Sequence, residues 1–230
     1  MTIGSILTAV GLVIFGYLMG SLSPSVWLGK AVKGVDLRQH GSGNAGTTNA
    51  FRVLGKGVGV WVLICDVLKG VIPVVLSRYV SNPPVTVLVA IAAVIGHTFS
   101  IFLRGRGGKG VATGAGAAIA MIPVPMACLV GFFLFILLTT RIVSVASIAS
   151  TIALPLGAGL LYHYHLTGVW ATPLAYVVAC CLMAAVVLWG HRTNVGRLLH
   201  GTENRVGFPW NKKVKERTQA AKAASGGQSL

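Results

Sequence analysis

The sequence predicts an all-α polytopic membrane protein with about seven transmembrane helices, two of them short, its N-terminus outside and its C-terminus inside. Three observations support this fold class. Of the 230 residues, 54% are hydrophobic and only 10% are charged, with a mean hydropathy of +0.79, whereas about a quarter of the residues in soluble domains are charged. The apolar residues form runs long enough for spans of about 20 residues. The cations fall almost entirely between these runs.

The apolar runs give the expected helices in order. They cover roughly residues 3–29, 58–80, 85–103, 110–140, 143–162 and 170–190. As one helix, the run 110–140 would be about 46 Å long, against an apolar membrane core of about 30 Å. It is interrupted by Ile122-Pro-Val-Pro125, so it forms either one kinked span or a hairpin of two short helices.

The distribution of cations separates these two alternatives. With the hairpin and an outside N-terminus, every Lys and Arg except Arg78 and Lys69 falls on one face of the membrane. With a single kinked span, Arg141 and the basic C-terminus move to the other face. Because cytoplasmic loops carry an excess of Lys and Arg, the hairpin is favoured. We therefore expect a transmembrane domain over residues 1–207 and a basic, disordered cytoplasmic tail over 208–230.

The charge balance narrows the classes of partner. Nineteen Lys and Arg stand against four acids, a net charge of +15, which is typical of proteins that bind nucleic acid, anionic lipid or a small anion. Nucleic acid is disfavoured because the cations sit in short loops that leave no exposed domain to read it. The four cysteines lie in apolar runs without metal-ligand spacing, so neither a metal nor a cofactor is expected.

The first of three polar, glycine-rich stretches covers residues 36–49. Gly41, Gly43 and Gly46 match the G-x-G-x-x-G spacing, but no strand precedes them, and this excludes a dinucleotide fold. Glycines still let backbone N–H groups approach an anion closely. The candidate phosphate ligands here are Gly41, Ser42, Gly43, Asn44, Gly46, Thr47, Thr48 and Asn49, with the guanidinium of Arg52. The alternative is a flexible loop with a Ser or Asn cap.

The second stretch covers residues 97–113. Gly107, Gly108 and Gly110 surround Lys109, directly before the first short helix of the hairpin. Lys109 is not a Walker lysine, because Gly110 stands where Ser or Thr is required. A lysine and bare amides at a helix start still suit an anion. The alternative, simple anchoring at the membrane surface, explains Arg104 better than Lys109.

The third stretch covers residues 191–207. On a helix, His191 and Asn194 would share a face. Glu203 is one of only four acids and is expected to orient Arg205 or a substrate hydroxyl, or else to form a structural salt bridge.

Two polar features lie within the apolar runs. Asp66 and Lys69 are three residues apart in the second run, and because a lone charge in the membrane is costly, we expect them to form a structural pair. The segment from Gly20 to Pro24 either lines the site or only kinks the first helix.

Together, the three stretches resemble one family, the bacterial acyl-phosphate:glycerol-3-phosphate acyltransferases of the PlsY type. The resemblance rests on ordered segments across about residues 10–207. The matching segments are residues 20–30, 41–49, 96–99, 107–113, 191–194 and 201–205. Two departures from the usual pattern stand out. Ser23 and Ser25 stand where relatives usually have an apolar residue and Gly. Thr47 stands where Ala is usual.

The resemblance implies a seven-helix enzyme of the bacterial inner membrane with its site facing the cytoplasm. The reaction would transfer a fatty acyl group from acyl phosphate to glycerol 3-phosphate, giving lysophosphatidic acid and phosphate, the first committed step of phospholipid synthesis. It places Ser42, Arg52, Lys109, His191 and Asn194 at the reaction centre. Membrane lipids are expected partners, and an upstream acyl-phosphate synthase is a candidate one.

A competing class is a transporter of phosphate or another small anion, because broken helices with cationic ends also bind substrates in carriers. The glycine-rich stretches fall at one face rather than at mid-membrane, and the two halves show no repeat. Both observations favour the enzyme.

Overall fold

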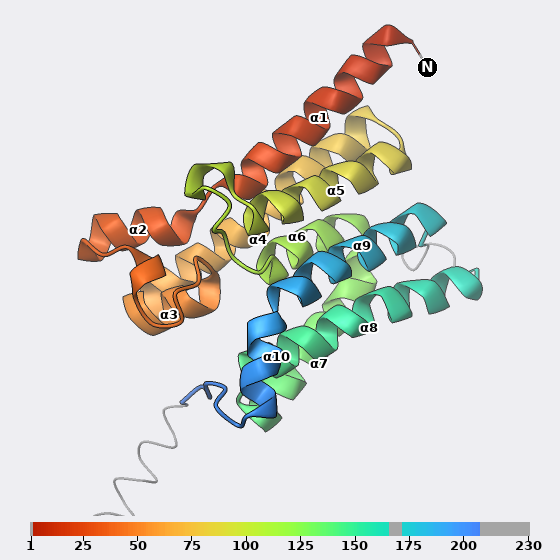
Figure 1. Cartoon of the computed structure of the whole chain (residues 1–230). Helices are drawn as coiled ribbons and strands as arrows, with labels where there is room; N and C mark the ends of the chain where they lie inside the picture. The colour runs from red at the N-terminus through yellow and green to blue at the C-terminus, as the bar shows by residue number, and fades with distance from the viewer. Residues whose placement is uncertain (1, 166–171, 208–230) are drawn as a thin grey trace, which may run out of the picture.

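The computed structural model describes residues 2–165 and 172–207 of the chain, and within them every regular element is a helix (Figure 1). The basic tail expected over residues 208–230 lies outside this part. In chain order the α-helices are α1 (Ile3–Ser21), α2 (Pro24–Lys33), α3 (Thr47–Leu54), α4 (Lys56–Val80), α5 (Pro83–Thr98), α6 (Val111–Met121), α7 (Pro123–Thr140), α8 (Val143–His163), α9 (Leu174–Gly190) and α10 (Arg192–Leu199). Two 3-10 turns, η1 (Leu37–Gln39) and η2 (Ile101–Leu103), lie in the loops.

Local sequence explains where several of these helices begin. Thr2 caps α1 by accepting a hydrogen bond from the backbone of Ser5, and Asn82 caps α5 in the same way. Prolines stand at the first position of α2, α5 and α7, where a missing N–H costs nothing. Pro24 therefore separates α2 from α1, so the first apolar run is broken rather than continuous.

Five segments of the described residues are long and apolar enough to cross a membrane. They are Ile3–Lys33, Lys56–Val80, Pro83–Leu103, Pro123–Thr140 and Val143–His163. A sixth is the pair α9 and α10, which passes the same test together but is bent by 56°. The protein is thus a multi-pass membrane protein, and the remaining expected segment, α6, is an apolar helix of eleven residues.

The hairpin alternative for residues 110–140 agrees with the observed path of the chain. The chain breaks at Ile122, between α6 and α7. Lys109, just before α6, hydrogen-bonds Asn194, and Arg141, just after α7, accepts a hydrogen bond from the backbone of Val206. Both ends of the α6–α7 segment therefore lie beside residues 194–206, as the antiparallel ribbons in Figure 1 also show.

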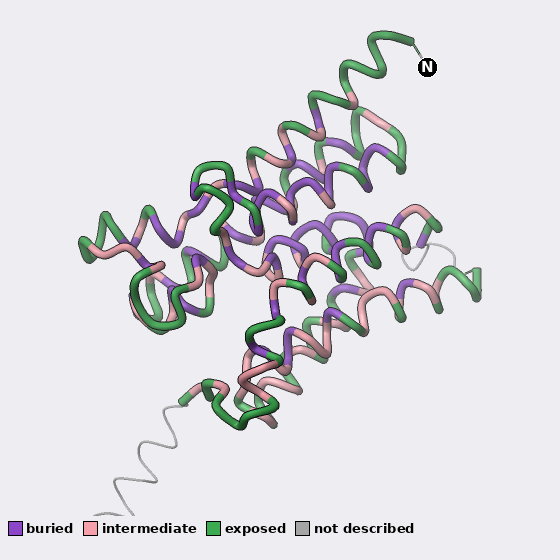
Figure 2. Tube along the Cα trace, viewed as in Figure 1, coloured by how far each residue is buried: buried purple, intermediate pink, exposed green. Residues whose placement is uncertain are grey.

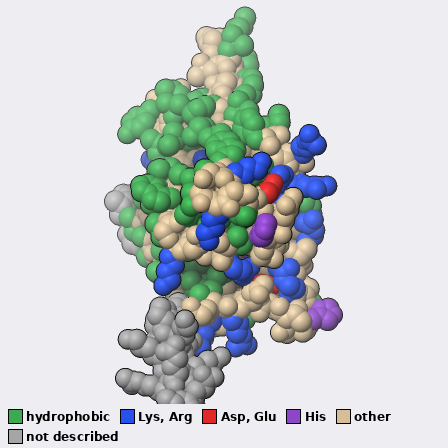
Figure 3. Space-filling model, turned by 90° about the vertical axis from the view of Figure 1, so that its left-hand side faces the viewer, with side chains coloured by type: hydrophobic (Ala, Val, Ile, Leu, Met, Phe, Trp, Pro, Cys, Tyr) green, Lys and Arg blue, Asp and Glu red, His purple; other side chains and the backbone are tan. Residues whose placement is uncertain are grey.

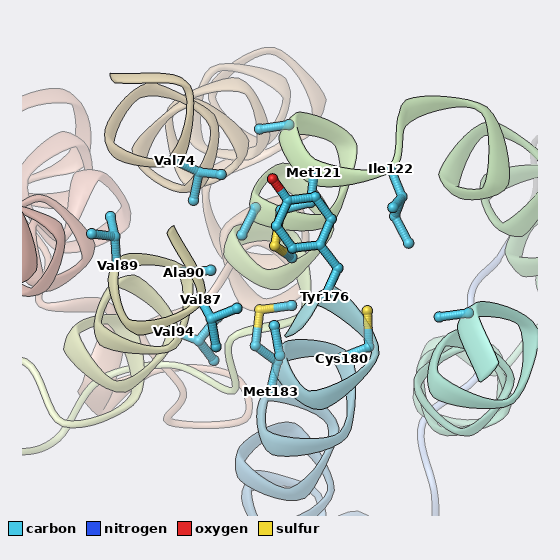
Figure 4. Close-up of a cluster of buried hydrophobic side chains, with 14 of the residues drawn as sticks. Val74, Val87, Val89, Ala90, Val94, Met121, Ile122, Tyr176, Cys180 and Met183 are labelled. Carbon is cyan, nitrogen blue, oxygen red and sulfur yellow. The ribbon is translucent and has the colours of Figure 1, made fainter. Parts of the chain in front are cut away.

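The core is formed by α1, α4, α5, α6 and α9. Figure 4 shows Val74 from α4, Val89 and Val94 from α5, Met121 at the end of α6 and Met183 from α9 converging between these helices. Outward-facing apolar side chains remain exposed along the helices, as the tube in Figure 2 shows by its green outer turns. In a membrane these faces contact lipid, and the helices pack on one another through small residues.

Glycines set the closest helix contacts. A Cβ on Gly20 would collide with the backbone of Ala93, which presses α1 against α5. A Cβ on Gly70 would collide with the carbonyl of Thr113, and one on Gly116 with that of Val67, which presses α4 against α6. These contacts fix α4, α5 and α6 relative to one another and so fix the loops at their ends.

Candidate active site

The first glycine-rich loop, residues 36–46, is folded around the side chain of Asn49. The amide nitrogen of Asn49 donates to the carbonyls of Leu37, His40 and Asn44 at 3.0–3.1 Å, and its oxygen accepts from the backbone N–H of Ser42 at 2.9 Å. Both N–H bonds of the amide are thereby used. We therefore assign Asn49 to shaping the loop and leave it out of the phosphate contacts.

The loop conformation presents Ser42 at the surface. Gly41 and Gly43 have φ angles of +64° and +71°, which favour glycine. A Cβ on Gly41 would also collide with the side chain of Asn49. Ser42, between the two glycines, is exposed, as is Thr48 in the first turn of α3. The loop thus ends at Gly46, the residue before α3, with its hydroxyls facing outward.

Thr47, one of the departures from the family pattern, has a definite partner. Its hydroxyl donates to a carboxylate oxygen of Asp66 in α4 at 2.8 Å. Asp66 also forms the expected ion pair with Lys69, at 3.0 Å. The other departure has a partner as well, since the hydroxyl of Ser25 in α2 donates to the carbonyl of Ala45 at 2.7 Å. Both departures therefore tie the first loop to neighbouring helices.

The second loop, residues 104–110, lies flat on the end of α5. The backbone N–H groups of Gly107 and Gly108 donate to the carbonyls of Thr98 and His97 at 3.2 and 3.0 Å. A Cβ on either glycine would collide with the end of α5. These two amides therefore hold the loop, and the groups left to meet a ligand are Lys109 and the first turn of α6, whose N–H groups have no acceptor within the helix.

A chain of hydrogen bonds joins the second stretch to the third. The ammonium of Lys109 donates to the side-chain oxygen of Asn194 in α10. The amide nitrogen of Asn194 donates to Glu203 at 3.1 Å, and the same carboxylate oxygen accepts from Arg197 at 2.9 Å. The sequence suggested Arg205 as the partner of Glu203, but the partner in the structure is Arg197. Arg197 was missed because no motif marks it.

The electrostatics of Lys109 link the first stretch to the other two. Burial lowers the pKa of Lys109 from 10.5 to about 8, the nearby charges of Arg197 and Arg52 act in the same direction, and Glu203 opposes them. Arg52 is on α3 and exposed. Three cations from three separate stretches therefore act on one another, which is costly unless an anion joins them.

His191 lies at the bend between α9 and α10. Its side chain is only 2% exposed, and Nδ1 lies 2.8 Å from the carbonyl of Val187. A carbonyl can only accept, so Nδ1 carries the proton and Nε2 is the nitrogen left for another partner. Lys109 and Glu203 are close enough to act on His191 through their charges.

Seen from the end of the bundle that carries α2, α3 and α10, Lys and Arg side chains are scattered over the face, among hydrophobic and other side chains (Figure 3). Of the described cations, Lys69 lies inside the bundle and Arg78 at the far end of α4, where its guanidinium donates to the carbonyl of Ala120. Among the expected site residues, Ser42 and Arg52 are exposed and Lys109 is half-buried.

A family model described as glycerol-3-phosphate acyltransferase matches residues 10–201. Two curated proteins named glycerol-3-phosphate acyltransferase, from Shouchella clausii and Chlorobium phaeobacteroides, are each 40% identical to this chain over 88% of its length and 98% of theirs.

Two crystal structures of PlsY, an integral membrane glycerol 3-phosphate acyltransferase, have a similar fold. The glycerol 3-phosphate form has a TM-score of 0.79 at 38% identity, and the lysophosphatidic acid form has 0.77 at 37%. Each match covers 87% of this chain and 96% of the other.

Proposed function

The chain belongs to the glycerol-3-phosphate acyltransferase family, and on that basis we propose how its residues perform the reaction. It is an acyltransferase that acts on glycerol 3-phosphate to give lysophosphatidic acid. We infer that the acyl donor is acyl phosphate. The observation that carries the proposal is the chain Lys109–Asn194–Glu203, with Arg52 acting on Lys109.

In this proposal the cations hold two phosphate groups. Lys109 and Arg52 bind the phosphate of glycerol 3-phosphate, and the loop from Gly41 to Gly46, with the hydroxyl of Ser42, holds the phosphate of the donor. The lowered pKa of Lys109 supports this role, because a dianion would relieve the repulsion that Arg197 and Arg52 impose. The residual amides of α6 and Gly110 face the same anions.

The chemical step is an acyl transfer between oxygens. The free hydroxyl of glycerol 3-phosphate attacks the acyl carbonyl, an ester C–O bond forms, and the C–O bond to phosphate breaks with its electrons leaving on phosphate. The hydroxyl proton passes either to Nε2 of His191 or to a phosphate oxygen. Cations that stabilise the departing phosphate supply most of the rate. No covalent enzyme ester is required.

The role of Asn194 follows from its two hydrogen bonds. Its oxygen faces Lys109 while its amide donates to Glu203, and Glu203 is itself held by Arg197. Asn194 can therefore hold the ammonium of Lys109 in one place, and Glu203 keeps the Asn194 amide from turning over. This supports Glu203 as an indirect participant.

We further propose that all seven segments enter the membrane, with the N-terminus outside and the cationic end in the cytoplasm of a bacterial inner membrane. The positive-inside rule supports this orientation. It brings the site to the surface where soluble glycerol 3-phosphate is available.

Detergent-purified protein mixed with palmitoyl phosphate and glycerol 3-phosphate tests the proposal directly. We expect lysophosphatidic acid and phosphate in equal amounts, and no product when either substrate is omitted. Phosphate flux through liposomes without acyl transfer would instead identify a carrier.

A further inference from the structure

A buried polar cluster lies behind the proposed site and takes no part in the mechanism described above. Its centre is the carboxylate of Asp66 in α4, whose side chain is 2% exposed. One carboxylate oxygen pairs with the ammonium of Lys69 at 3.0 Å and lies 3.7 Å from Nδ1 of His97. The other accepts the hydroxyl hydrogen bond of Thr47 at 2.8 Å.

Besides Lys69 on its own helix, Asp66 has neighbours on two other segments near the site. Thr47 is the first residue of α3, directly after Gly46 and the donor-phosphate loop. His97 is near the end of α5, where its ring fills the space in which a Cβ of Gly108 would stand and its carbonyl accepts from the N–H of Gly108. Gly108 is next to Lys109. Asp66 therefore touches the supports of both phosphate-binding segments.

Two further bonds extend the cluster. The ammonium of Lys69 donates to the carbonyl of Leu22 at 2.6 Å, at the break between α1 and α2. Nδ1 of His97 lies 3.2 Å from the hydroxyl of Thr113 in the first turn of α6. The start of α6, which follows Lys109, is thus tied to the same group as the start of α3.

Stability alone is a poor explanation for this arrangement. Removing two charges from water costs so much that replacing a buried ion pair by apolar residues is often neutral or stabilising. The cost is greater within a membrane protein, where intramembrane charges mark functional positions. What the pair provides here, and an apolar pair could not, is directed hydrogen bonds to two separate segments, at Thr47 and Leu22, beside the ring of His97.

We propose that Asp66 is a positioning residue that holds the loop bearing Ser42 and the turn bearing Lys109 in register, with the Thr47 hydroxyl as its contact to the loop. This inference rests on the proposed function, since the distance between the two phosphates is what the register would set. A loosened register weakens the grip on glycerol 3-phosphate while the bundle stays folded.

Substitution of Thr47 tests the hydrogen bond between its hydroxyl and Asp66. Thr47→Val removes the hydroxyl and keeps the shape, whereas Thr47→Ser keeps the hydroxyl. We expect Thr47→Val to raise the KM for glycerol 3-phosphate about tenfold, in line with the loss of a hydrogen bond to a charged acceptor, and Thr47→Ser to restore it to within about twofold.

A matched control comes from the other end of α4. Ser77 is fully buried and its hydroxyl bonds that of Thr86 at 3.2 Å. Ser77→Ala also removes a buried hydrogen bond from α4, but far from the site. We expect it to lower the unfolding temperature without changing either KM.

The double variant Asp66→Leu/Lys69→Met tests the cluster itself, because it removes both charges, leaves neither unpaired and offers the Thr47 hydroxyl no acceptor. We expect folded protein whose kcat/KM for glycerol 3-phosphate is lower by about 10- to 100-fold. Adding Thr47→Val to it should cost less than about twofold more, because both changes break the same contact.

The outcomes separate this inference from the proposed function. If wild-type protein makes no lysophosphatidic acid, the proposed function fails. If it does, an unchanged KM in Thr47→Val, an equal rise in Ser77→Ala, or failure of Thr47→Val to fold would each reduce the cluster to a structural role and overturn the inference.

Discussion

The four helices α1, α4, α5 and α6 differ sharply in their packing from the pair α7 and α8. In the first group, glycines at contact points leave no room for a Cβ. In the second, a Cβ added to Gly131, Gly157 or Gly159 would meet no other segment within 4 Å. Glycine thus allows close helix contacts in the first group and makes no such contact at these three positions in the second.

The site is attached mainly to the closely packed helices. The loop bearing Ser42 is held through Asp66 on α4, and the turn bearing Lys109 is held by the end of α5. The pair α7 and α8 approaches the site through the bond between Val206 and Arg141. The role of a glycine in this protein therefore depends on its neighbours, and the closest helix contacts lie in the helices that carry the proposed site.

The largest effect is expected from bulk placed between α4 and α6. Gly70→Val would force its side chain into the carbonyl of Thr113, so we expect little folded protein. Gly157→Val, in open space on α8, is the matched control. Yield of monodisperse protein and the unfolding temperature measure both, and equal behaviour of the two variants would contradict the difference in packing.

The next effect concerns the group that the closely packed helices present. We expect Lys109→Ala to lose about 10²- to 10³-fold in acyl transfer, as when a preorganised charge-stabilising donor is removed, while its unfolding temperature stays near that of the wild type. Lys56→Ala, an exposed lysine at the start of α4, should keep its rate. Full activity of Lys109→Ala would remove this residue from the site.

A smaller effect is expected in the third stretch, which is attached through α9 and α10. Glu203→Gln keeps the shape but weakens the bonds from Arg197 and Asn194. We expect kcat/KM to fall about tenfold, the value of a charge-assisted hydrogen bond. Initial rates at varied glycerol 3-phosphate measure it, and a loss as large as that of Lys109→Ala would mean that Glu203 contacts the substrate directly.

The protonation of Lys109 gives a pH dependence. With its pKa lowered to about 8, the free enzyme loses the needed ammonium above that pH, so kcat/KM should fall about fivefold between pH 8 and pH 9. Stability moves the other way. From about 8 to 10.5 the unfolded chain binds the proton that the folded chain has lost, so unfolding becomes harder as pH rises. Lys109→Arg should abolish the decline in rate.

The smallest effect belongs to the loosely packed helices. Gly157→Ala adds a methyl group in open space within α8, and Ala is the better helix former by up to about 1 kcal/mol. We expect an unfolding temperature equal to or slightly above that of the wild type and unchanged kinetics. A clear drop would show that α8 packs against a surface in the membrane.

Much of the fold could be predicted from hydropathy. The run 143–162 corresponds to α8, Val143–His163, and the run 58–80 to α4, Lys56–Val80. Pro123 and Pro125 marked the break between helices at Ile122. The separate helix α2 was harder to predict, because Pro24 could equally have kinked one span, and the short amphipathic helix α3 was interpreted as loop.

The sequence predicted the cations of the candidate site better than the side chains that hold its loops in place. The positively charged loops on one face were expected to converge, and Lys109 and Asn194 do meet. The task of Asn49 and the partner of Glu203 depend on side-chain geometry across loops, for which spacing in the sequence gives no signal. The pairing of Asp66 with Lys69 followed from the cost of lone charges in lipid.

The bond between Arg78 and Ala120 has a consequence for the surrounding lipid. With eleven residues, α6 is about 16 Å long, roughly half the thickness of the apolar layer. Its last carbonyls therefore end inside that layer and are met by a cation reaching from α4. We expect a bilayer to thin or admit water around this guanidinium, and the activity of the enzyme to respond to the thickness of its host membrane.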